Sequence, residues 1–242
     1  MKFTRKLKLL TLIILSSTVF FIYNKTNYNN ITYTSLGDSL AVGIDSYGQR
    51  TYSYSDYVKE YLISKKKLKK YSKTFTTEDM TIEKLYNYIL INKEMNHDNK
   101  KENVKEILQE TDYLTISIGL NDLLYKLTLT NELNDNNLNI IIEEISNSFD
   151  ELIKEIRKVY RHEIFVIGYY DINIDNKIYK KAIQKLNNIY KANSEVIYIS
   201  TYIISENKNI FLSNPSKYYP NYKGYQVISS KIIDKISKKL EK

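Results

Sequence analysis

Strand-like and helix-like segments alternate along most of the chain, and this alternation restricts the possible folds more than any other feature. Strand-like residues fill five short runs, at 31–36, 69–75, 113–119, 163–170 and 196–200. Helical periodicity marks the segments 55–66, 81–91, 103–110, 139–160, 176–193 and 224–240. Strands separated by helices predict a parallel sheet with helices on both faces. The pattern therefore predicts one α/β domain over residues 31–242.

In such a sheet, ligands bind at the carboxyl ends of the strands, so the residues just after positions 36, 118, 170 and 200 matter most for function. Two helix starts can also be predicted. Ser55 is a plausible N-cap of the helix at 55–66, and Thr81 suits the start of the next helix.

The first 25 residues have the layout of a secretory signal, with a basic start and an apolar run over 9–23. No small-x-small cleavage site precedes Asn24, which favours an uncleaved signal anchor over a cleaved signal peptide. Because positive charge stays on the inner side of a membrane, we expect the domain to lie outside, joined to the anchor by a polar linker at 26–30. Secretion after cleavage is the alternative.

The net charge of +8 does not indicate a nucleic-acid partner. Residues 1–25 hold five basic residues and no acidic one, which leaves 31 bases against 28 acids in the remainder. The absence of cysteine excludes disulfides, a thiol nucleophile and thiolate metal sites. We expect no cofactor, because the two histidines and the acidic residues form no cluster with metal-ligand spacing.

Two segments that follow strands carry the chemistry. The first is "SLGDSLAVG" at 35–43, where a tight turn directs the hydroxyl of Ser39 to the carboxyl edge of the sheet. The second is "SIGLNDLL" at 117–124, which brings Gly119 and Asn121 to the same edge. Backbone N–H groups beside the serine and the amide of an asparagine are suitable donors to a developing oxyanion.

Together these segments resemble the SGNH/GDSL hydrolases, and "YPNYKGYQVI" at 219–228 resembles the "HPNxxGYxxI" segment that closes such chains. The resemblance implies a flavodoxin-like three-layer α/β/α sandwich with Ser39 as nucleophile. It also implies an oxyanion site from the Ser39 N–H, Gly119 and Asn121. Asp79 is the best match to the family's second-block glycine, and it would place a negative charge beside that site.

The chain departs from the family at the catalytic base. Tyr219 stands at the histidine position, and Lys217 and Ser216 stand where the orienting acid belongs. A phenol has an ordinary pKa of about 10, so little phenolate exists at neutral pH. We expect Tyr219 to fill the histidine's place and to hydrogen-bond Ser39.

We expect neither histidine of the chain to replace the missing base, although a loop that folds back would leave His97 the better candidate of the two. His162 precedes the strand-like run 163–170, which puts it at the amino edge, opposite the expected site. His97 lies in a polar segment that we expect to be a solvated loop.

Three interpretations follow. The first is a membrane-anchored, extracytoplasmic SGNH-like protein with lost or strongly reduced esterase activity, whose pocket still binds a small acylated or glycan ligand. The second is an active serine acyl-ester hydrolase or O-acyl transferase, acting on cell-envelope or lipid esters through an unrecognised base. The third is a purely structural or interaction protein.

Overall fold

A computed structural model describes residues 30–97, 100–171, 176–212 and 219–240. Its centre is a parallel five-stranded sheet with the order β2-β1-β5-β6-β7. The strands are β1 (Ile31–Gly37), β2 (Leu68–Ser72), β5 (Tyr113–Ser117), β6 (Ile164–Ile167) and β7 (Val196–Ile199). This is the strand order of flavodoxin-like folds, in which ligands bind at the carboxyl edge. The predicted fold class is confirmed.

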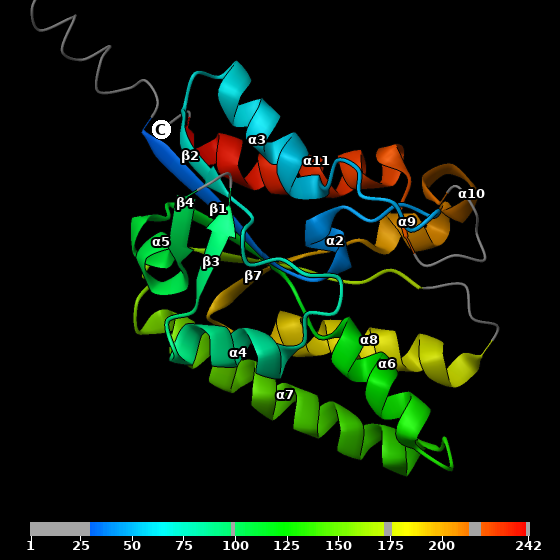
Figure 1. Ribbon diagram of the computed structural model, residues 1–242. Coiled ribbons are helices and arrows are strands. Elements are labelled where there is room, and N and C mark those ends of the chain that lie inside the picture. The colour runs from blue at the N-terminus through cyan, green and yellow to red at the C-terminus, as the bar shows by residue number, and fades with distance from the viewer. Residues whose placement is uncertain (1–29, 98–99, 172–175, 213–218, 241–242) are drawn as a thin grey trace, which may run out of the picture.

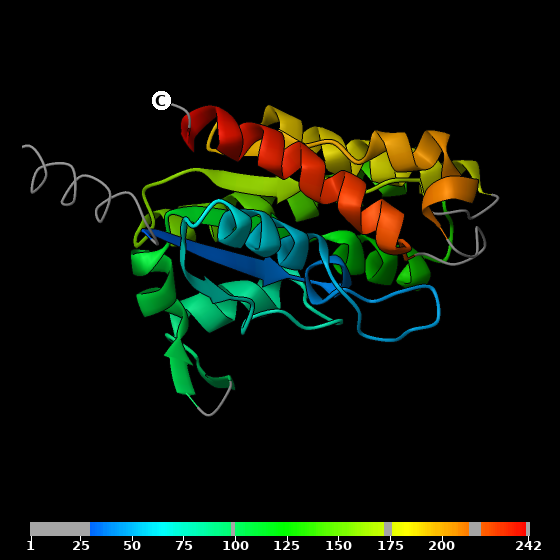
Figure 2. The same cartoon turned by 90° about the horizontal axis from the view of Figure 1, so that it is seen from above.

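Helices cover both faces of the sheet (Figures 1 and 2). On one face lie α3 (Tyr54–Ser64) and α11 (Tyr222–Leu240), which pack against each other. On the other face lie α4 (Ile82–Leu90), α7 (Asp135–Arg157) and α8 (Lys177–Ala192). The remaining helices are α2 (Ser39–Val42), α5 (Val104–Glu110), α6 (Leu120–Leu129), α9 (Tyr202–Glu206) and α10 (Lys208–Phe211).

The core lies on both sides of the central strands. Every residue of β1 and β6, and all but the first of β5, is buried, as expected for parallel strands covered on two faces. Several tyrosines are also fully buried, among them Tyr33, Tyr190 and Tyr225. Many of the chain's tyrosines therefore serve packing, with the hydroxyl bonded inside the protein.

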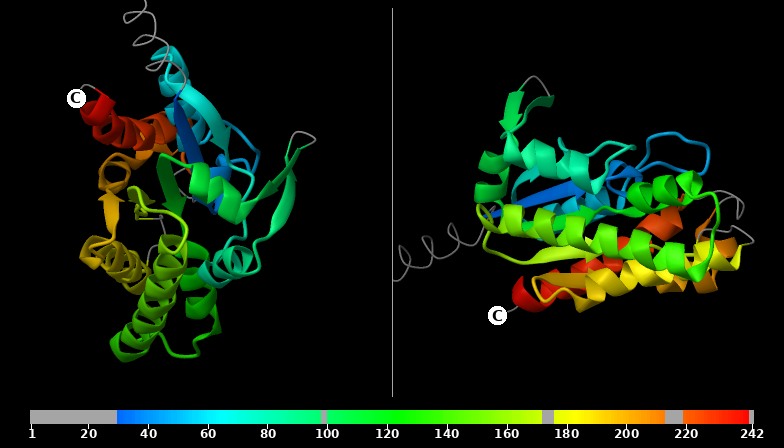
Figure 3. Two further views of the ribbon diagram at one scale, coloured as in Figure 1. Left: turned by 90° about the vertical axis from the view of Figure 1, so that its left-hand side faces the viewer. Right: turned by 90° about the horizontal axis from the view of Figure 1, so that it is seen from below.

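A two-stranded antiparallel hairpin, β3 (Glu94–His97) and β4 (Lys100–Asn103), stands out from the body (Figures 2 and 3). The expectation that His97 lies in a loop is wrong, since it belongs to β3. The hairpin is polar, so it carries no apolar alternation from which a strand could be predicted. Its attachment comes from Glu102, which accepts hydrogen bonds from Ser72 Oγ at 2.7 Å and Thr74 Oγ1 at 2.6 Å.

The start of α3 differs from the prediction by two residues. Ser53, not Ser55, is the N-cap, because it forms a capping box with Asp56. Ser53 Oγ accepts from the Asp56 N–H at 3.3 Å, and Asp56 Oδ2 accepts from the Ser53 N–H at 2.9 Å. The other predicted cap is confirmed: Thr81 Oγ1 accepts from the Lys84 N–H at 3.2 Å.

The expected anchor or signal peptide at 1–25 and the linker at 26–29 lie outside the described residues. Among the helices that the structure does describe, none combines the length and the apolar character required to cross a bilayer.

Candidate active site

The turn that carries Ser39 is built on a close approach between β1 and β5. Gly37, the last residue of β1, has φ +124°, and a Cβ there would lie 1.9 Å from the carbonyl oxygen of Ser117. Only glycine fits this position. The next N–H, of Asp38, donates to that same carbonyl at 2.9 Å. The chain then enters α2 at once, so Ser39 stands at the carboxyl edge of the sheet as the first residue of a helix.

Asp38 is a buried carboxylate that holds this turn together. Its Oδ1 accepts from the Leu40 N–H at 3.1 Å, which caps α2, and from Ser117 Oγ at 2.7 Å. Its Oδ2 accepts from the hydroxyl of Tyr169. Burial raises the pKa of Asp38 to about 6, against the opposing effect of the hydrogen bonds from Tyr169, Ser117 and Leu40. The sequence analysis missed this residue, although an aspartate directly before a helix is a typical N-cap.

Ser39 opens into a small pocket. The side chains that line it come from α2, α6, the segment after β6 and the segment before α11: Ser39, Leu40, Leu120, Asn121, Leu124, Tyr169, Tyr170 and Tyr219. The pocket has a volume of about 40 Å³. Ser39 itself is 7% exposed. Within the described part of the chain, the Ser39 hydroxyl has no hydrogen-bond partner.

Among the described residues that line the pocket there is no histidine and no carboxylate. Tyr219 takes part in it, as expected for the residue at the histidine position, but the expected hydrogen bond to Ser39 is not found. Burial raises the pKa of both Tyr169 and Tyr170 well above the ordinary value, so both stay neutral phenols at physiological pH. Lys217 and Ser216 lie outside the described residues. The lining therefore offers Ser39 no efficient general base.

The segment after Tyr219 has a structural role at the start of α11. Asn221 Oδ1 accepts from the Gly224 N–H at 3.0 Å at the start of α11, and Asn221 Nδ2 donates to the carbonyl oxygen of Ile210 at 2.9 Å. A Cβ on Gly224 would lie 2.7 Å from the Phe211 carbonyl oxygen. These residues dock α11 onto α10, a structural role that does not require a base at position 219.

Asn121 lies in the pocket, but its amide is already engaged. Asn121 Nδ2 donates to the carbonyl oxygens of Glu78 and Met80, each at 2.9 Å. The neighbouring Asp122 accepts from the Ile82 N–H through both carboxylate oxygens, at 3.2 and 3.1 Å. Both side chains thus attach α6 to segment 78–82. In this conformation the Asn121 amide has no proton left for an oxyanion.

Gly119 and Asp79 are not among the residues that line the pocket. Gly119 begins α6 with φ +104°, and a Cβ there would lie 2.6 Å from the hydroxyl of Tyr190. The Asp79 carboxylate is 77% exposed and pairs with Lys84 Nζ at 2.8 Å, which lowers its pKa. The structure therefore brings Ser39, Asn121 and Tyr219 together and gives Gly119 and Asp79 other surroundings.

The prediction for His162 is confirmed. It lies just before β6 at the amino edge of the sheet, beside Arg157 and Glu195, on the side opposite Ser39. In the described part of the chain, no three side chains of metal-binding type come together.

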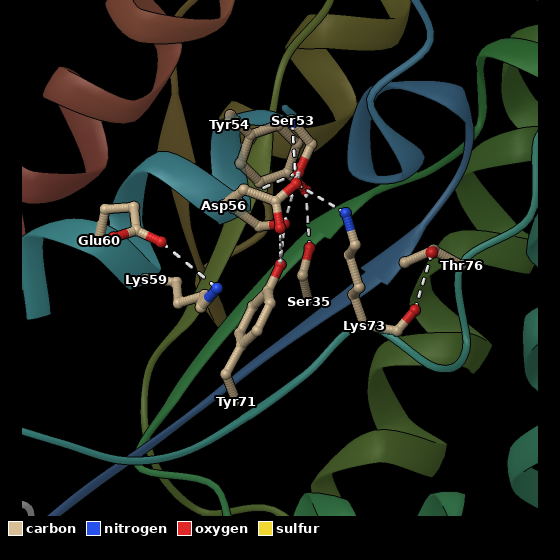
Figure 4. Close-up of polar contacts among 10 residues, drawn as sticks. Ser35, Ser53, Tyr54, Asp56, Lys59, Glu60, Tyr71, Lys73 and Thr76 are labelled. Atoms are coloured by element: carbon tan, nitrogen blue, oxygen red, sulfur yellow. Dashed lines mark hydrogen bonds and ion pairs between the residues drawn. The ribbon is translucent and has the colours of Figure 1, made fainter. Parts of the chain in front are cut away.

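A second polar cluster positions the segment that Asn121 contacts (Figure 4). Asp56 of α3 pairs with Lys73 Nζ at 2.6 Å and accepts from the Tyr71 hydroxyl at 3.1 Å. Burial alone would raise the pKa of Asp56, but hydrogen bonds from Lys73 and Ser53 lower it below the ordinary value. The cluster fastens the end of β2 to α3, and so fixes where the chain leaves the sheet toward segment 78–82.

The family assignment rests on a sequence match. The family model described as GDSL-like Lipase/Acylhydrolase matches residues 33–232. The chain belongs to this family. The matched range contains the whole sheet, the turn of Ser39, and Tyr219. A search of curated proteins finds no match.

Solved structures of similar fold include a lipase and an esterase. The lipase Lip_vut3 from a goat rumen metagenome has a TM-score of 0.64 at 19% identity, over 84% of this chain and 96% of that one. The acetylxylan esterase Axe2 from Geobacillus stearothermophilus has a TM-score of 0.58 at 15% identity, over 87% and 96%. Catalytic mutants of Axe2 replace a serine, an aspartate or a histidine by alanine.

Proposed function

We propose that this protein is a GDSL-family domain that binds a small acyl ester at Ser39 and hydrolyses it extremely slowly. The observation that carries the proposal is the composition of the Ser39 pocket: Tyr219 lies where the resemblance places the base, and the described lining residues include no histidine or carboxylate. The free hydroxyl of Ser39 and the engaged amide of Asn121 support it.

The size of the pocket sets the size of the acyl group. A site for one water molecule needs roughly 10–15 Å³ of such space, so a pocket of about 40 Å³ holds about three atoms of that size. This volume matches an acetyl group better than a long acyl chain. Leu120 and Leu124 of α6 close the pocket on its apolar side.

The expected rate follows from the missing base. Loss of the histidine of a serine triad costs on the order of 10⁶ in turnover. Against a typical turnover of about 10 s⁻¹, this predicts about 10⁻⁵ s⁻¹. An occupied Asn121 amide would lower the rate further, because removal of one oxyanion donor costs about 10²–10³.

Hydrolysis of p-nitrophenyl acetate by the full chain tests the proposal, with Ser39→Ala as the reference for background. We expect the two rates to agree within about tenfold. Tyr219→His should raise the Ser39-dependent rate by about 10², the usual contribution of a positioned base. Tyr222→His is the matched control, because Tyr222 lies three residues further along and is 58% exposed outside the pocket.

The competing function is an active acyl-ester hydrolase or O-acyl transferase. One observation favours it: Ser39 keeps its position in the tight turn between β1 and α2, at the carboxyl edge of the sheet. Rapid labelling of Ser39 by a fluorophosphonate, together with Ser39-dependent turnover of about 1 s⁻¹ or more, would establish this function and refute ours.

We also propose that residues 1–25 anchor the domain at the outer side of the membrane. The basic start and the apolar run support an anchor, and the absence of a cleavage site supports its retention. The full-length chain should resist extraction by alkaline carbonate and should be digested by protease added to intact spheroplasts. A mature protein that begins near residue 26, recovered from the medium, would indicate secretion instead.

A further inference from the structure

A second and much larger cavity lies at the carboxyl edge of the sheet, between α8, the end of β7 and α9. It encloses about 630 Å³, within the range of about 300–1,000 Å³ that is usual for small-molecule sites. We call it the α8–α9 cavity, and the residues that define its chemistry are Gln184, Asn187, Asn188, Tyr198, Tyr202 and Ser205. Tyr169 lines both this cavity and the Ser39 pocket, so the two spaces are neighbours separated by one side chain.

The charges of the α8–α9 cavity balance. Asp171 lies at its wall and pairs with Lys180 and Lys208, at 3.2 Å in both cases. The ammonium of Lys191 lies 5.3 Å from the centre of the Tyr198 ring. Lys208 lies outside the lining, and Glu206 belongs to it. Among the described lining residues, two bases, Lys180 and Lys191, therefore face two acids, Asp171 and Glu206, and this balance favours a neutral ligand.

Amide groups on α8 provide hydrogen bonds for such a ligand. Gln184 and Asn188 are one helical turn apart, and both side chains are exposed on the face that borders the cavity. Neither amide has a partner in the part of the chain that the structure describes. Each amide offers two donors and an acceptor, a combination that matches the hydroxyl groups of a polyol. An apolar ligand would leave these groups unpaired, at a cost in free energy.

Tyrosines provide the apolar contact. Tyr202 of α9 is 62% exposed, and Tyr198 of β7 is half-buried beside it at the wall. A tyrosine ring combines an apolar face with a polar tip. Sugar rings have the complementary construction, with C–H groups on a face and hydroxyls on the rim.

From these contacts we propose that the α8–α9 cavity is a binding site for a neutral saccharide, separate from the Ser39 pocket. The saccharide packs on Tyr202 and Tyr198, and its hydroxyls bond to Gln184 and Asn188. Binding at this site does not depend on hydrolysis at Ser39, so the proposal is tested independently of the proposed function.

Hydrogen bonds connect the wall of the α8–α9 cavity to the turn that carries Ser39. Asn187 holds the backbone of Tyr169 at two points: its Oδ1 accepts from the Tyr169 N–H at 2.8 Å, and its Nδ2 donates to the Tyr169 carbonyl at 2.7 Å. The hydroxyl of Tyr169 in turn donates to Asp38, next to Ser39. A saccharide in the cavity would therefore lie one residue away from the small pocket.

Isothermal titration calorimetry on the full chain tests the site, in a polyoxyethylene detergent because a maltoside headgroup would compete. The neutral probes are xylotriose, maltotriose and chitotriose, and trigalacturonate is the anionic comparison. At least one neutral trisaccharide should bind with a Kd of about 1 mM or below. Tyr202→Ala, and separately the double variant Gln184→Ala with Asn188→Ala, should each weaken binding about tenfold or more.

Two controls locate the binding. Tyr125→Ala removes a tyrosine of α6 that is 65% exposed and lies outside the cavity, and it should leave the affinity unchanged. Ser39→Ala should also bind normally. The proposal is overturned if no neutral probe binds at about 10 mM, or if trigalacturonate binds as tightly as the neutral probes. It is equally overturned if Tyr202→Ala binds the saccharide as tightly as the wild type does. Loss of binding in Ser39→Ala would also overturn it, because this result would place the saccharide in the small pocket.

Discussion

Replacement of Asp38 by asparagine should stabilise the protein at neutral pH. Burial raises the pKa of Asp38 from 3.8 to about 6, so the native state holds this proton more tightly than the unfolded chain does. The stabilisation from the protonated carboxyl is complete below about pH 4, and it is lost as the pH rises through about 6. The shift corresponds to about 3 kcal/mol at 1.36 kcal/mol for each pKa unit.

Asparagine removes the charge and keeps the shape. Its Oδ1 still accepts from the Leu40 N–H and from Ser117 Oγ, and its Nδ2 donates to the phenol oxygen of Tyr169. Asp38→Asn should therefore raise the free energy of unfolding by up to about 3 kcal/mol at about pH 8. The difference from the wild type should shrink toward zero near about pH 4.

Urea titrations of both proteins across this pH range, followed by near-ultraviolet circular dichroism, measure that difference. Asp79→Asn is the control, because hydrogen bonds from Lys84 lower the pKa of this exposed carboxylate. The control should lose stability at neutral pH, by no more than about 1 kcal/mol, and the loss should vanish in acid. A difference for Asp38→Asn that is independent of pH, or a less stable variant at about pH 8, would refute the reasoning.

Three further substitutions test the architecture around the site. Gly119→Ala should lower the free energy of unfolding by about 1–3 kcal/mol, because φ is +104° and the new methyl group meets the Tyr190 hydroxyl. Gly48→Ala, at φ +76° with open space around it, should lower the free energy of unfolding by less, and equal urea midpoints for the two variants would contradict this prediction. Lys73→Met leaves the buried carboxylate of Asp56 without its ion pair and should lower the free energy of unfolding by about 2 kcal/mol, against less than about 1 kcal/mol for Lys84→Met at an exposed ion pair. The reverse order in chemical denaturation would contradict the role given to the polar cluster around Asp56. Leu124→Ala should let methyl butyrate as well as methyl acetate bind at Ser39 in saturation-transfer NMR, and a variant that still selects the acetate would show that α6 does not set the acyl size.

Much of the fold could be predicted because its signals are local. Buried parallel strands are continuous apolar runs, and amphipathic helices repeat with the helical period, so the alternation of the two predicted the sheet and the positions of Ser39, Asn121 and His162 at its edges. The hairpin of β3 and β4 has no such signal. It is polar on both strands, and it is held by backbone pairing and by Glu102.

In the candidate site, too, some features follow from the sequence and others depend on the tertiary structure. The sequence by itself determined that a serine follows the first strand and that the segment from Tyr219 continues into a helix, and it predicted that Tyr219 stands at the histidine position. Only the tertiary structure decided that the Asn121 amide donates both of its hydrogen bonds to the carbonyl oxygens of Glu78 and Met80. It alone decided that Asp38 is buried, and that a wide polar cavity lies behind Tyr169. Residue types and their order follow from local preferences, but hydrogen-bond partners, burial and empty space depend on distant segments that meet only in the folded chain.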